Sequence, residues 1–300
     1  MVRAAKIRIA TGDRGLVAAN YVFLSLWLVA ILFPLMFILS ASFSNPSAVI
    51  AGRVWLWPVE PTLLGYEAVF EYRSVWSGYA NSVFYAVVGT SMNLALTIAA
   101  AYPLSRRNFF GRNLLMAIFT FTMFFSGGLI PLYLVVKSLG LINLRAALLL
   151  PSALAVWNVI IARTFFQHNI PDELLEVSQI EGCSDYRFVW SVVLPLSGPI
   201  VAVLALFYAV GHWNSYFFAL IFLSDPAKQP LQIVLREVLV LSRVTFESPV
   251  SDVERVLERQ HLEQLLKYSL IIVASVPVLL IYPFAQRYFV KGVMIGALKG

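Results

Sequence analysis

Few residues of this chain have the types and spacing that catalysis or metal binding would need. The histidines His168, His212 and His261 fall in separate segments, and the single cysteine, Cys183, can form no disulfide within the chain. The apolar runs hold no paired carboxylates, and no serine lies in a nucleophile-elbow pattern. The sequence therefore predicts no catalytic residue, no cofactor site and no metal site on this chain.

One glycine-rich segment superficially resembles a phosphate-binding loop. The segment Gly292-Val-Met-Ile-Gly296-Ala-Leu-Lys299 has the wrong spacing for that loop and lacks a serine or threonine after the lysine. We therefore expect no nucleotide site in this basic C-terminal segment, residues 290–300.

An acidic amphipathic segment at residues 171–182 is the clearest candidate for a binding surface. Pro171 suits the first turn of a helix, and Gly182 suits the left-handed residue that ends one. A helix of about ten residues is too short to be stable alone, so it needs a partner surface. That surface is either its own helix bundle, with the helix lying passively on the membrane face, or another protein. Its apolar stripe comprises Leu174, Val177 and Ile180, and its acidic side chains include Glu173, Glu176 and Glu181.

A polar and aromatic group interrupts an apolar run at residues 212–216. Aromatic faces and amide groups suit the stacking and hydroxyl hydrogen bonds of a sugar, and polar groups at membrane depth often line a pathway. The alternative is that they join neighbouring helices as packing contacts. The candidates are His212, Trp213, Asn214 and Tyr216, with Trp157 and Asn158 as a weaker second set.

The composition predicts an all-α polytopic membrane protein. Hydrophobic residues make up 60% of the 300 residues and charged residues only 13%, whereas soluble domains carry about 25% charged residues. A spanning helix needs about 20 apolar residues, and six candidate spans are present. They are residues 21–43, 80–103, 113–136 (interrupted by Gly127, Gly128 and Pro131), 146–166, 195–223 and 265–289.

Lysine and arginine gather beside alternate ends of these spans, which predicts that both termini lie in the cytoplasm. The net charge of +6 then reflects membrane anchoring rather than nucleic-acid binding. We expect a cytoplasmic segment 1–20, a transmembrane domain 21–289 and a cytoplasmic tail 290–300. Within the domain, residues 167–194 form a cytoplasmic loop and residues 224–264 an outer loop.

The cytoplasmic loop resembles the coupling loop of permeases of bacterial ABC importers. That loop carries Glu-Ala-Ala, three residues, Gly, nine residues and Ile-x-Leu-Pro. This chain has Glu176-Val177-Ser178, three residues, Gly182, nine residues and Val192-Val193-Leu194-Pro195. The glutamate, glycine and proline are in place, whereas Val177, Ser178 and Val192 depart from the pattern. We expect these departures to leave the docking role in place and to tune the fit to a particular ATPase.

Other segments are similar to carbohydrate-importer permeases, and more narrowly to the branch for complex oligo- and polysaccharides, which is related to the second permease of the maltose importer. They are Ser105-Arg-Arg, Phe124-Phe-Ser-Gly-Gly-Leu-Ile-Pro131, Gly211-His-Trp-Asn-Ser-Tyr216 and Tyr288-Phe-Val-Lys-Gly-Val-Met-Ile-Gly296. The resemblance implies a six-helix type I importer permease fold in the bacterial cytoplasmic membrane. It implies that this non-catalytic chain pairs with a second, different permease, two copies of an ATPase that binds ATP and magnesium, an external solute-binding protein and a saccharide.

The resemblance also implies that the coupling loop contacts the ATPase. The residues that would do so are Glu173, Glu176, Val177, Ser178, Glu181, Gly182, Leu194 and Pro195. A uronate polymer and a neutral plant oligosaccharide are both plausible cargoes.

Two other functions remain as alternatives. An ion-coupled secondary transporter would need ionisable residues at mid-membrane, and essentially only His212 qualifies. An intramembrane enzyme would need a catalytic group that the sequence does not offer.

Overall fold

The computed structural model describes residues 13–244, 266–283 and 286, and within them it is helical with no strand. The predicted basic tail 290–300 and most of the positively charged segment 1–20 lie outside the described residues. The chain divides into two compact units. One unit comprises Met1–Glu71 with Val238–Val273, and the other comprises Tyr72–Glu237 with Ala274–Gly300.

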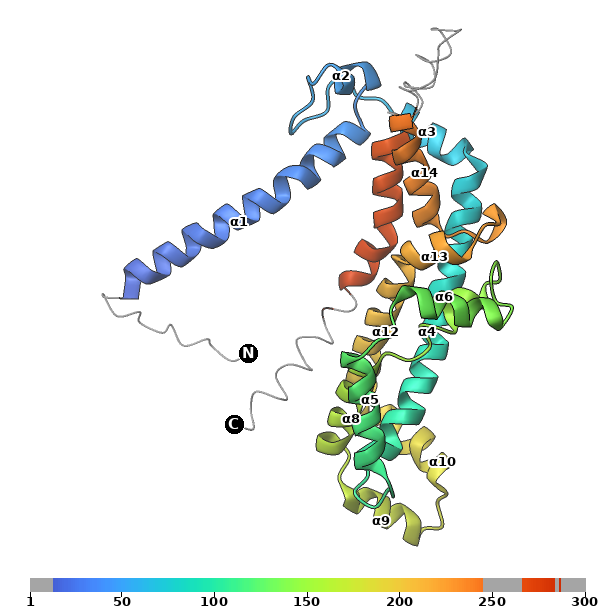
Figure 1. The fold of residues 1–300 in the computed structure, drawn as a ribbon. Coiled ribbons are helices and arrows are strands. Elements are labelled where there is room, and N and C mark those ends of the chain that lie inside the picture. The colour runs from blue at the N-terminus through green and yellow to red at the C-terminus, as the bar shows by residue number, and fades with distance from the viewer. Residues whose placement is uncertain (1–12, 245–265, 284–285, 287–300) are drawn as a thin grey trace. The chain divides into compact units, whose positions relative to one another are not determined.

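Figure 1 labels most of the helices in chain order. Their bounds are α1 (Asp13–Ser42), α2 (Pro46–Ile50), α3 (Leu64–Glu71), α4 (Arg73–Ser105), α5 (Arg112–Phe124), α6 (Leu129–Ser138), α7 (Ala146–Leu149), α8 (Val156–Asn169), α9 (Asp172–Ile180), α10 (Asp185–Phe188), a π-helix (Val189–Val193), α11 (Leu194–Leu196), α12 (Gly198–Trp213), α13 (Phe217–Phe222), a 3-10 turn (Pro226–Lys228) and α14 (Leu231–Val244). A last described helix covers Leu266–Pro283.

Three described helices are long and apolar enough to cross a membrane: α1, α4 and Leu266–Pro283. They correspond to the first, second and sixth predicted spans, although α1 and α4 both begin earlier than the apolar runs suggested. The count reaches five if two sharply bent helix pairs each form one span. One pair is α5 with α6, bent by 113°, and the other is Asp185–Leu196 with α12, bent by 84°.

The predicted interruption of the third span is confirmed. The break lies at residues 125–128, where Gly128 has a φ of 82°, a backbone conformation that glycine adopts without steric cost. The change of direction between α5 and α6 is far larger than an ordinary proline kink.

The fourth and fifth predicted spans were wrong as continuous helices. Residues 146–166 contain the short α7, a turn around Pro151, and then α8. Proline lacks a backbone N–H and its ring clashes with the carbonyl four residues earlier, so a helix breaks there easily. In the region of the fifth predicted span, α11 ends at Leu196, α12 covers Gly198–Trp213, and residues 214–216 separate α12 from α13.

Within the second unit, α4 packs against both α12 and α8. The contact face of α4 repeats every four residues, which is the spacing that places side chains on one side of a helix. All of these residues are buried: Asn81, Tyr85, Gly89, Asn93, Thr97 and Ala101. Polar residues therefore make up half of the face that holds this helix in the bundle.

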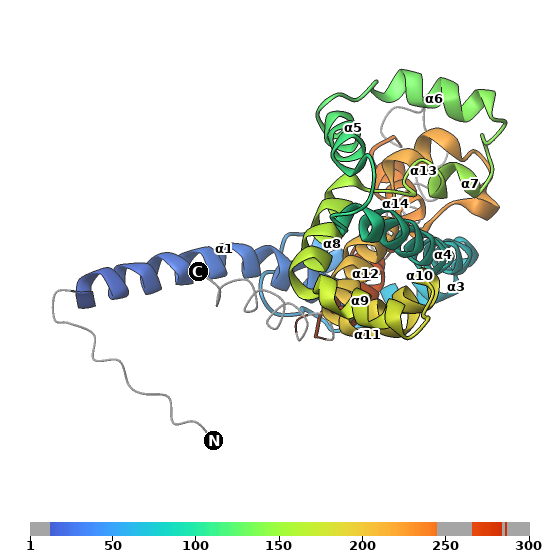
Figure 2. The same ribbon diagram turned by 90° about the horizontal axis from the view of Figure 1, so that it is seen from below.

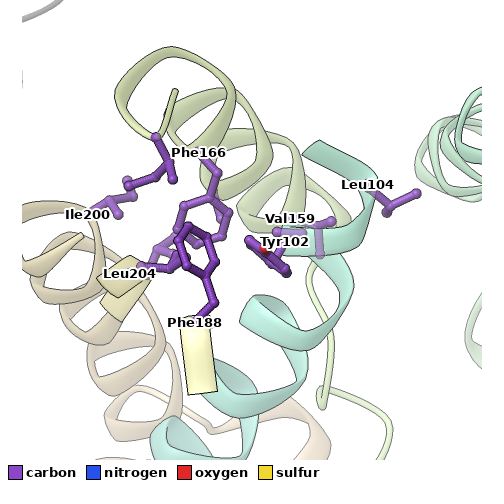
Figure 3. Close-up of a cluster of buried hydrophobic side chains, with 11 residues drawn as sticks. Tyr102, Leu104, Val159, Phe166, Phe188, Ile200 and Leu204 are labelled. Carbon is purple, nitrogen blue, oxygen red and sulfur yellow. The ribbon is translucent and has the colours of Figure 1, made fainter. Parts of the chain in front are cut away.

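An apolar cluster closes one end of the same bundle. Tyr102 of α4, Phe166 of α8, Phe188 of α10 and Leu204 of α12 all lie in this cluster and are buried. Figure 3 shows Phe166, Phe188 and Leu204 converging on one another from three different helices. Burying such a side chain stabilises a fold by about 1.5–3 kcal/mol, so this cluster holds the segment 172–196 onto the bundle.

Candidate functional site

The predicted short helix is α9, and it lies at the end of the bundle where α4 and α8 finish (Figures 1 and 2). Its C-terminus is a complete Schellman motif. The N–H of Cys183 donates to the carbonyl of Ser178 at 2.9 Å, and the N–H of Gly182 donates to the carbonyl of Gln179 at 3.0 Å. Gly182 has a φ of 73°, so the predicted role of this glycine as a left-handed stop is confirmed.

The N-terminus of α9 is held by Arg106, which follows the last turn of α4. One guanidinium nitrogen, Nη1, lies 3.1 Å from Oδ1 of Asp172 and donates to the carbonyl of Ile170 at 3.3 Å. The guanidinium also stacks over the ring of Tyr102, with its central carbon 4.9 Å from the ring centre. Arg106 therefore ties α9 to α4 and to the apolar cluster.

Arg106 carries a charge but is buried, with only 8% of its surface exposed. Within the described part of the chain, its Nε and Nη2 atoms have no hydrogen-bond partner. Burying a cation that is only partly paired costs free energy. We therefore expect the groups that do pair with Arg106 to be held in fixed positions. Sequence analysis included Arg106 only in the Ser105-Arg-Arg segment and among the positive charges beside the spans. Nothing in the sequence indicates that its partner lies 66 residues later.

The predicted apolar stripe of α9 points away from its own unit. Leu174 is 41% exposed, Val177 is 55% exposed and Ile180 is 87% exposed. The residues that face the bundle are instead Leu175, which packs on the apolar cluster, and Ser178, which is buried. A helix that packed passively on its own bundle would turn its apolar stripe toward that bundle. The apolar stripe of α9 faces outward instead and is available to a partner.

The predicted acidic residues of α9 share this outer surface. Glu173, Glu176, Glu181 and Gly182 are all exposed. Ser178, by contrast, is buried, and its hydroxyl donates to the carbonyl of Leu175 within the helix at 2.8 Å.

Leu194 and Pro195 lie in α11, beyond a five-residue π-helix, Val189–Val193. Because Pro195 has no N–H, it cannot continue the regular i to i−4 ladder, and a π-turn before it accommodates the missing bond. Pro195 is exposed and Leu194 is half-buried. The segment from Gly182 to Pro195 therefore leads from the exposed helix into the bend before α12.

The predicted pathway residues divide into a buried and an exposed set. His212 is buried, and its Nε2 lies 2.7 Å from Oδ1 of Asn93 on α4. Asn93 Nδ2 in turn donates to the carbonyl of Ser152. Trp213 is also buried, and its indole N–H donates to the carbonyl of Ala274 at 3.1 Å. These contacts favour the packing alternative for His212 and Trp213.

The exposed set keeps the pathway hypothesis open. Asn214 and Tyr216 lie at the break between α12 and α13, where both are exposed. Trp157 is 59% exposed on α8, whereas its neighbour Asn158 is buried. The residues that could meet a solute are therefore Asn214, Tyr216 and Trp157.

A second polar cluster, which sequence analysis missed, lies toward the other end of α4. Asn81 Nδ2 donates to the carbonyl of Ala227 at 2.8 Å, and the Tyr85 hydroxyl donates to the carbonyl of Lys228 at 2.8 Å. Arg145 Nη2 completes the cluster by donating to Asn81 Oδ1 at 2.8 Å. These bonds fix the start of the loop 224–264 to the bundle.

Asn143 orders the same loop from its other side. Its Oδ1 accepts the N–H groups of Ser224 and Asp225 at 3.2 and 2.9 Å, and its carbonyl accepts from the Lys228 ammonium at 2.9 Å. The hydrogen bond from Lys228, together with the backbone N–H of Ala227, holds the pKa of Asp225 below its usual range. The carboxylate of Asp225 also forms an ion pair with the Lys228 ammonium, with 3.0 Å between Oδ2 and Nζ.

The chain is similar in sequence to known transport proteins. It is 43% identical over 267 residues to Protein LplC of Bacillus subtilis, covering 89% of each chain. It is 40% identical over 280 residues to the polygalacturonan/rhamnogalacturonan transport system permease protein YtcP of the same species, covering 93% of this chain and 96% of the relative.

The fold is similar to that of a solved structure as well. A chain from a bacterial ABC transporter involved in the import of the acidic polysaccharide alginate matches with a TM-score of 0.85 and 31% identity, covering 95% of this chain and all of the other. Residues 93–295, which include α9 and its Schellman turn, match the family described as the binding-protein-dependent transport system inner membrane component. The chain therefore belongs to that family, the membrane-embedded permeases of ABC importers, which are transport components rather than enzymes.

Proposed function

We propose that this chain is the permease subunit of an importer for oligo- or polysaccharides. The assignment of a saccharide cargo rests on two matches. One is to YtcP, a polygalacturonan/rhamnogalacturonan permease, and the other is to the alginate importer, and each covers more than nine tenths of this chain. Because the alginate importer handles an acidic polysaccharide, an acidic cargo is favoured over a neutral one.

The importer would contain partners that the family implies. They are a second, different permease, two copies of an ATPase that carries ATP and magnesium, and an extracytoplasmic solute-binding protein. In this arrangement both termini of the chain and residues 167–194 lie in the cytoplasm, and residues 224–264 lie outside.

The segment 171–195 would transmit the ATPase motion. The support is the outward-facing stripe of Leu174, Val177 and Ile180 with its flanking carboxylates. A helix of nine residues gains little stability from its own backbone, so its conformation depends on Arg106 at one end and the Gly182 turn at the other. A force that the ATPase applies to the exposed face of α9 would therefore be transmitted to α4 through Arg106 and to α12 through the bend after Pro195.

The test is uptake into proteoliposomes that contain the complete complex and trap ATP inside. We expect uptake of oligogalacturonate, delivered with the solute-binding protein, to require ATP and to exceed uptake of a neutral oligosaccharide of equal length. Uptake that is driven by an ion gradient without the ATPase would contradict the importer assignment. Equal uptake of both sugars would contradict the acidic cargo alone.

A further inference from the structure

The segment between α1 and α3, residues 43–62, is folded rather than a loose connection. Its two ends are joined because the N–H of Asn45 donates to the carbonyl of Val59 at 3.2 Å and the N–H of Thr62 donates to the carbonyl of Phe43 at 2.9 Å. Ala48 and Val54 are buried within it, and they form a small apolar core. We call residues 43–62 the Trp loop.

The Trp loop exposes two tryptophan side chains although its backbone is fixed. Trp55 is 69% exposed and Trp57 is 78% exposed. Ile50 and Leu56, at 59% and 41%, extend the same exposed apolar set. Leaving such surface in water forgoes about 25 cal/mol for each Å² that could be buried, and a fixed loop cannot turn the rings inward. This exposed apolar set therefore favours a binding partner that covers it.

A hydrogen bond sets the depth of the two tryptophans. The hydroxyl of Ser40, in the last turn of α1, donates to the carbonyl of Leu56 at 2.5 Å. Leu56 lies between Trp55 and Trp57 in sequence, so this bond joins the backbone beside both tryptophans to the last turn of α1. Ser44 strengthens the same connection, because its hydroxyl accepts the N–H of Val59 at 3.0 Å.

The length of α1 places that end in the lipid headgroup layer. Its 30 residues correspond to about 45 Å of helix, and a bilayer with its headgroups is about 40–45 Å thick. The most apolar window of α1 is wholly unburied, and the Trp loop that follows the helix exposes further apolar side chains. Tryptophan favours this interfacial depth because its ring is apolar and its indole N–H is polar.

We propose that Trp55 and Trp57 insert into the headgroup layer and anchor this end of α1 at the membrane boundary. The bilayer is favoured over a sugar because a sugar site needs several polar groups that converge on the ligand. The nearby hydroxyls of Ser40 and Ser44 are instead directed inward, where they hold the loop together. The one close ion pair, between Arg53 and Glu60 at 3.5 Å, leaves the loop without net charge to attract a charged partner.

The experiment compares tryptophan quenching in the complete complex, reconstituted in bilayers of brominated lipids. One complex carries the wild-type chain, one carries Trp55→Phe with Trp57→Phe, and a control carries Trp27→Phe, which removes an exposed tryptophan from the middle of α1. Subtracting the signal of a variant from that of the wild type isolates the emission of the tryptophans removed. Retained uptake shows that each variant is folded.

We expect lipids brominated near the headgroup to quench the Trp55 and Trp57 emission about twice as strongly as lipids brominated at the chain ends, as the interfacial preference of tryptophan requires. Quenching by aqueous iodide with no response to brominated lipid would overturn the proposal. Iodide quenching that is relieved by adding the solute-binding protein or the saccharide would also overturn it, because the partner would then be that molecule. The importer assignment is unaffected by either result, since uptake is measured separately.

Discussion

At the scale of single residues, Arg106 is the group on which the position of α9 depends most. It contacts Asp172, the Ile170 carbonyl and the Tyr102 ring from a buried position. The carboxylate of Asp172, however, is about half exposed, with 51% of its side chain accessible. Solvent therefore screens the pair, and its contribution is smaller than that of a fully buried ion pair.

Asp172→Asn removes the negative charge and keeps the shape of the side chain. We expect the substitution to lower stability by about 1 kcal/mol and to reduce ATP-driven uptake more than it reduces the amount of chain in the membrane. Thermal inactivation and uptake measure the two effects. Asp185→Asn is the matched control, because Asp185 is exposed in the next helix and has no ion pair among the described residues. An equal loss in both variants would count against the Arg106 contact.

Gly89 permits the contact between α4 and α12. A Cβ atom at this position would lie within 3.0 Å of three atoms of the His212 ring, whereas a Cβ at Gly211, the neighbour of His212, would meet nothing within 4 Å. We expect Gly89→Ala to destabilise the bundle by about 1–3 kcal/mol and Gly211→Ala to have little effect. The yield and melting temperature of the purified complex check this. His212→Ala should restore part of the loss in Gly89→Ala, and no restoration would argue that the ring is not the obstacle.

Prediction of single residues from the sequence succeeded where the role of a residue depends only on its neighbours in the chain. Gly182 was identified because a helix stop needs a left-handed residue at its C-terminal end, and the structure has one there. Arg106 and Asn93 could not be identified in this way, because their partners Asp172 and His212 are distant in sequence. The four-residue repeat of small and polar residues along α4 was a readable signal, but it was hidden within an apolar run.

At the scale of elements, α9 is a short helix fixed at both ends with its apolar stripe outward. A Cβ atom added at Gly182 would meet no other atom of this chain within 4 Å, so a substitution there acts through backbone strain alone. Left-handed backbone costs a non-glycine residue about 1–2 kcal/mol, and asparagine bears it better than a β-branched residue.

Gly182→Val should therefore disturb the end of α9 and reduce ATPase-coupled uptake, whereas Gly182→Asn should retain most of it. Uptake and co-purification of the ATPase, measured side by side, check the ordering. Equal activity of the two variants would show that the left-handed turn does not matter. Equal loss in both variants would show that the partner accepts only glycine, which has no side chain, at this position.

Helix boundaries were predicted less well than the spans themselves. The apolar runs indicated where membrane helices occur, because hydropathy reports the environment of a segment. They did not indicate the turn at Pro151 or the π-helix before Pro195. After α5 the sequence predicted an interruption but not its angle of 113°. Such breaks depend on which backbone groups neighbouring helices can satisfy, and membrane helices tolerate proline and glycine when that help is present.

At the scale of the whole molecule, α4 links two features. The exposed helix α9 lies at one end of α4, and the hydrogen-bonded polar cluster around Asn81 lies toward the other end. The first would receive the ATPase and the second fixes the start of the loop 224–264. We therefore expect motion of α9 to be transmitted along α4, because the buried face of α4 packs against both α8 and α12.

The most direct test of the coupling role is a reversal of charge on α9 in the complete reconstituted complex. Glu176→Lys and Glu67→Lys make the same change on exposed helical residues, one within the coupling segment and one in α3. For each variant, membrane insertion, ATPase co-purification and ATP-driven uptake are measured together. We predict that Glu176→Lys inserts normally but loses ATPase binding and most of its uptake, while Glu67→Lys keeps all three. Full uptake and normal ATPase binding by Glu176→Lys would contradict the account.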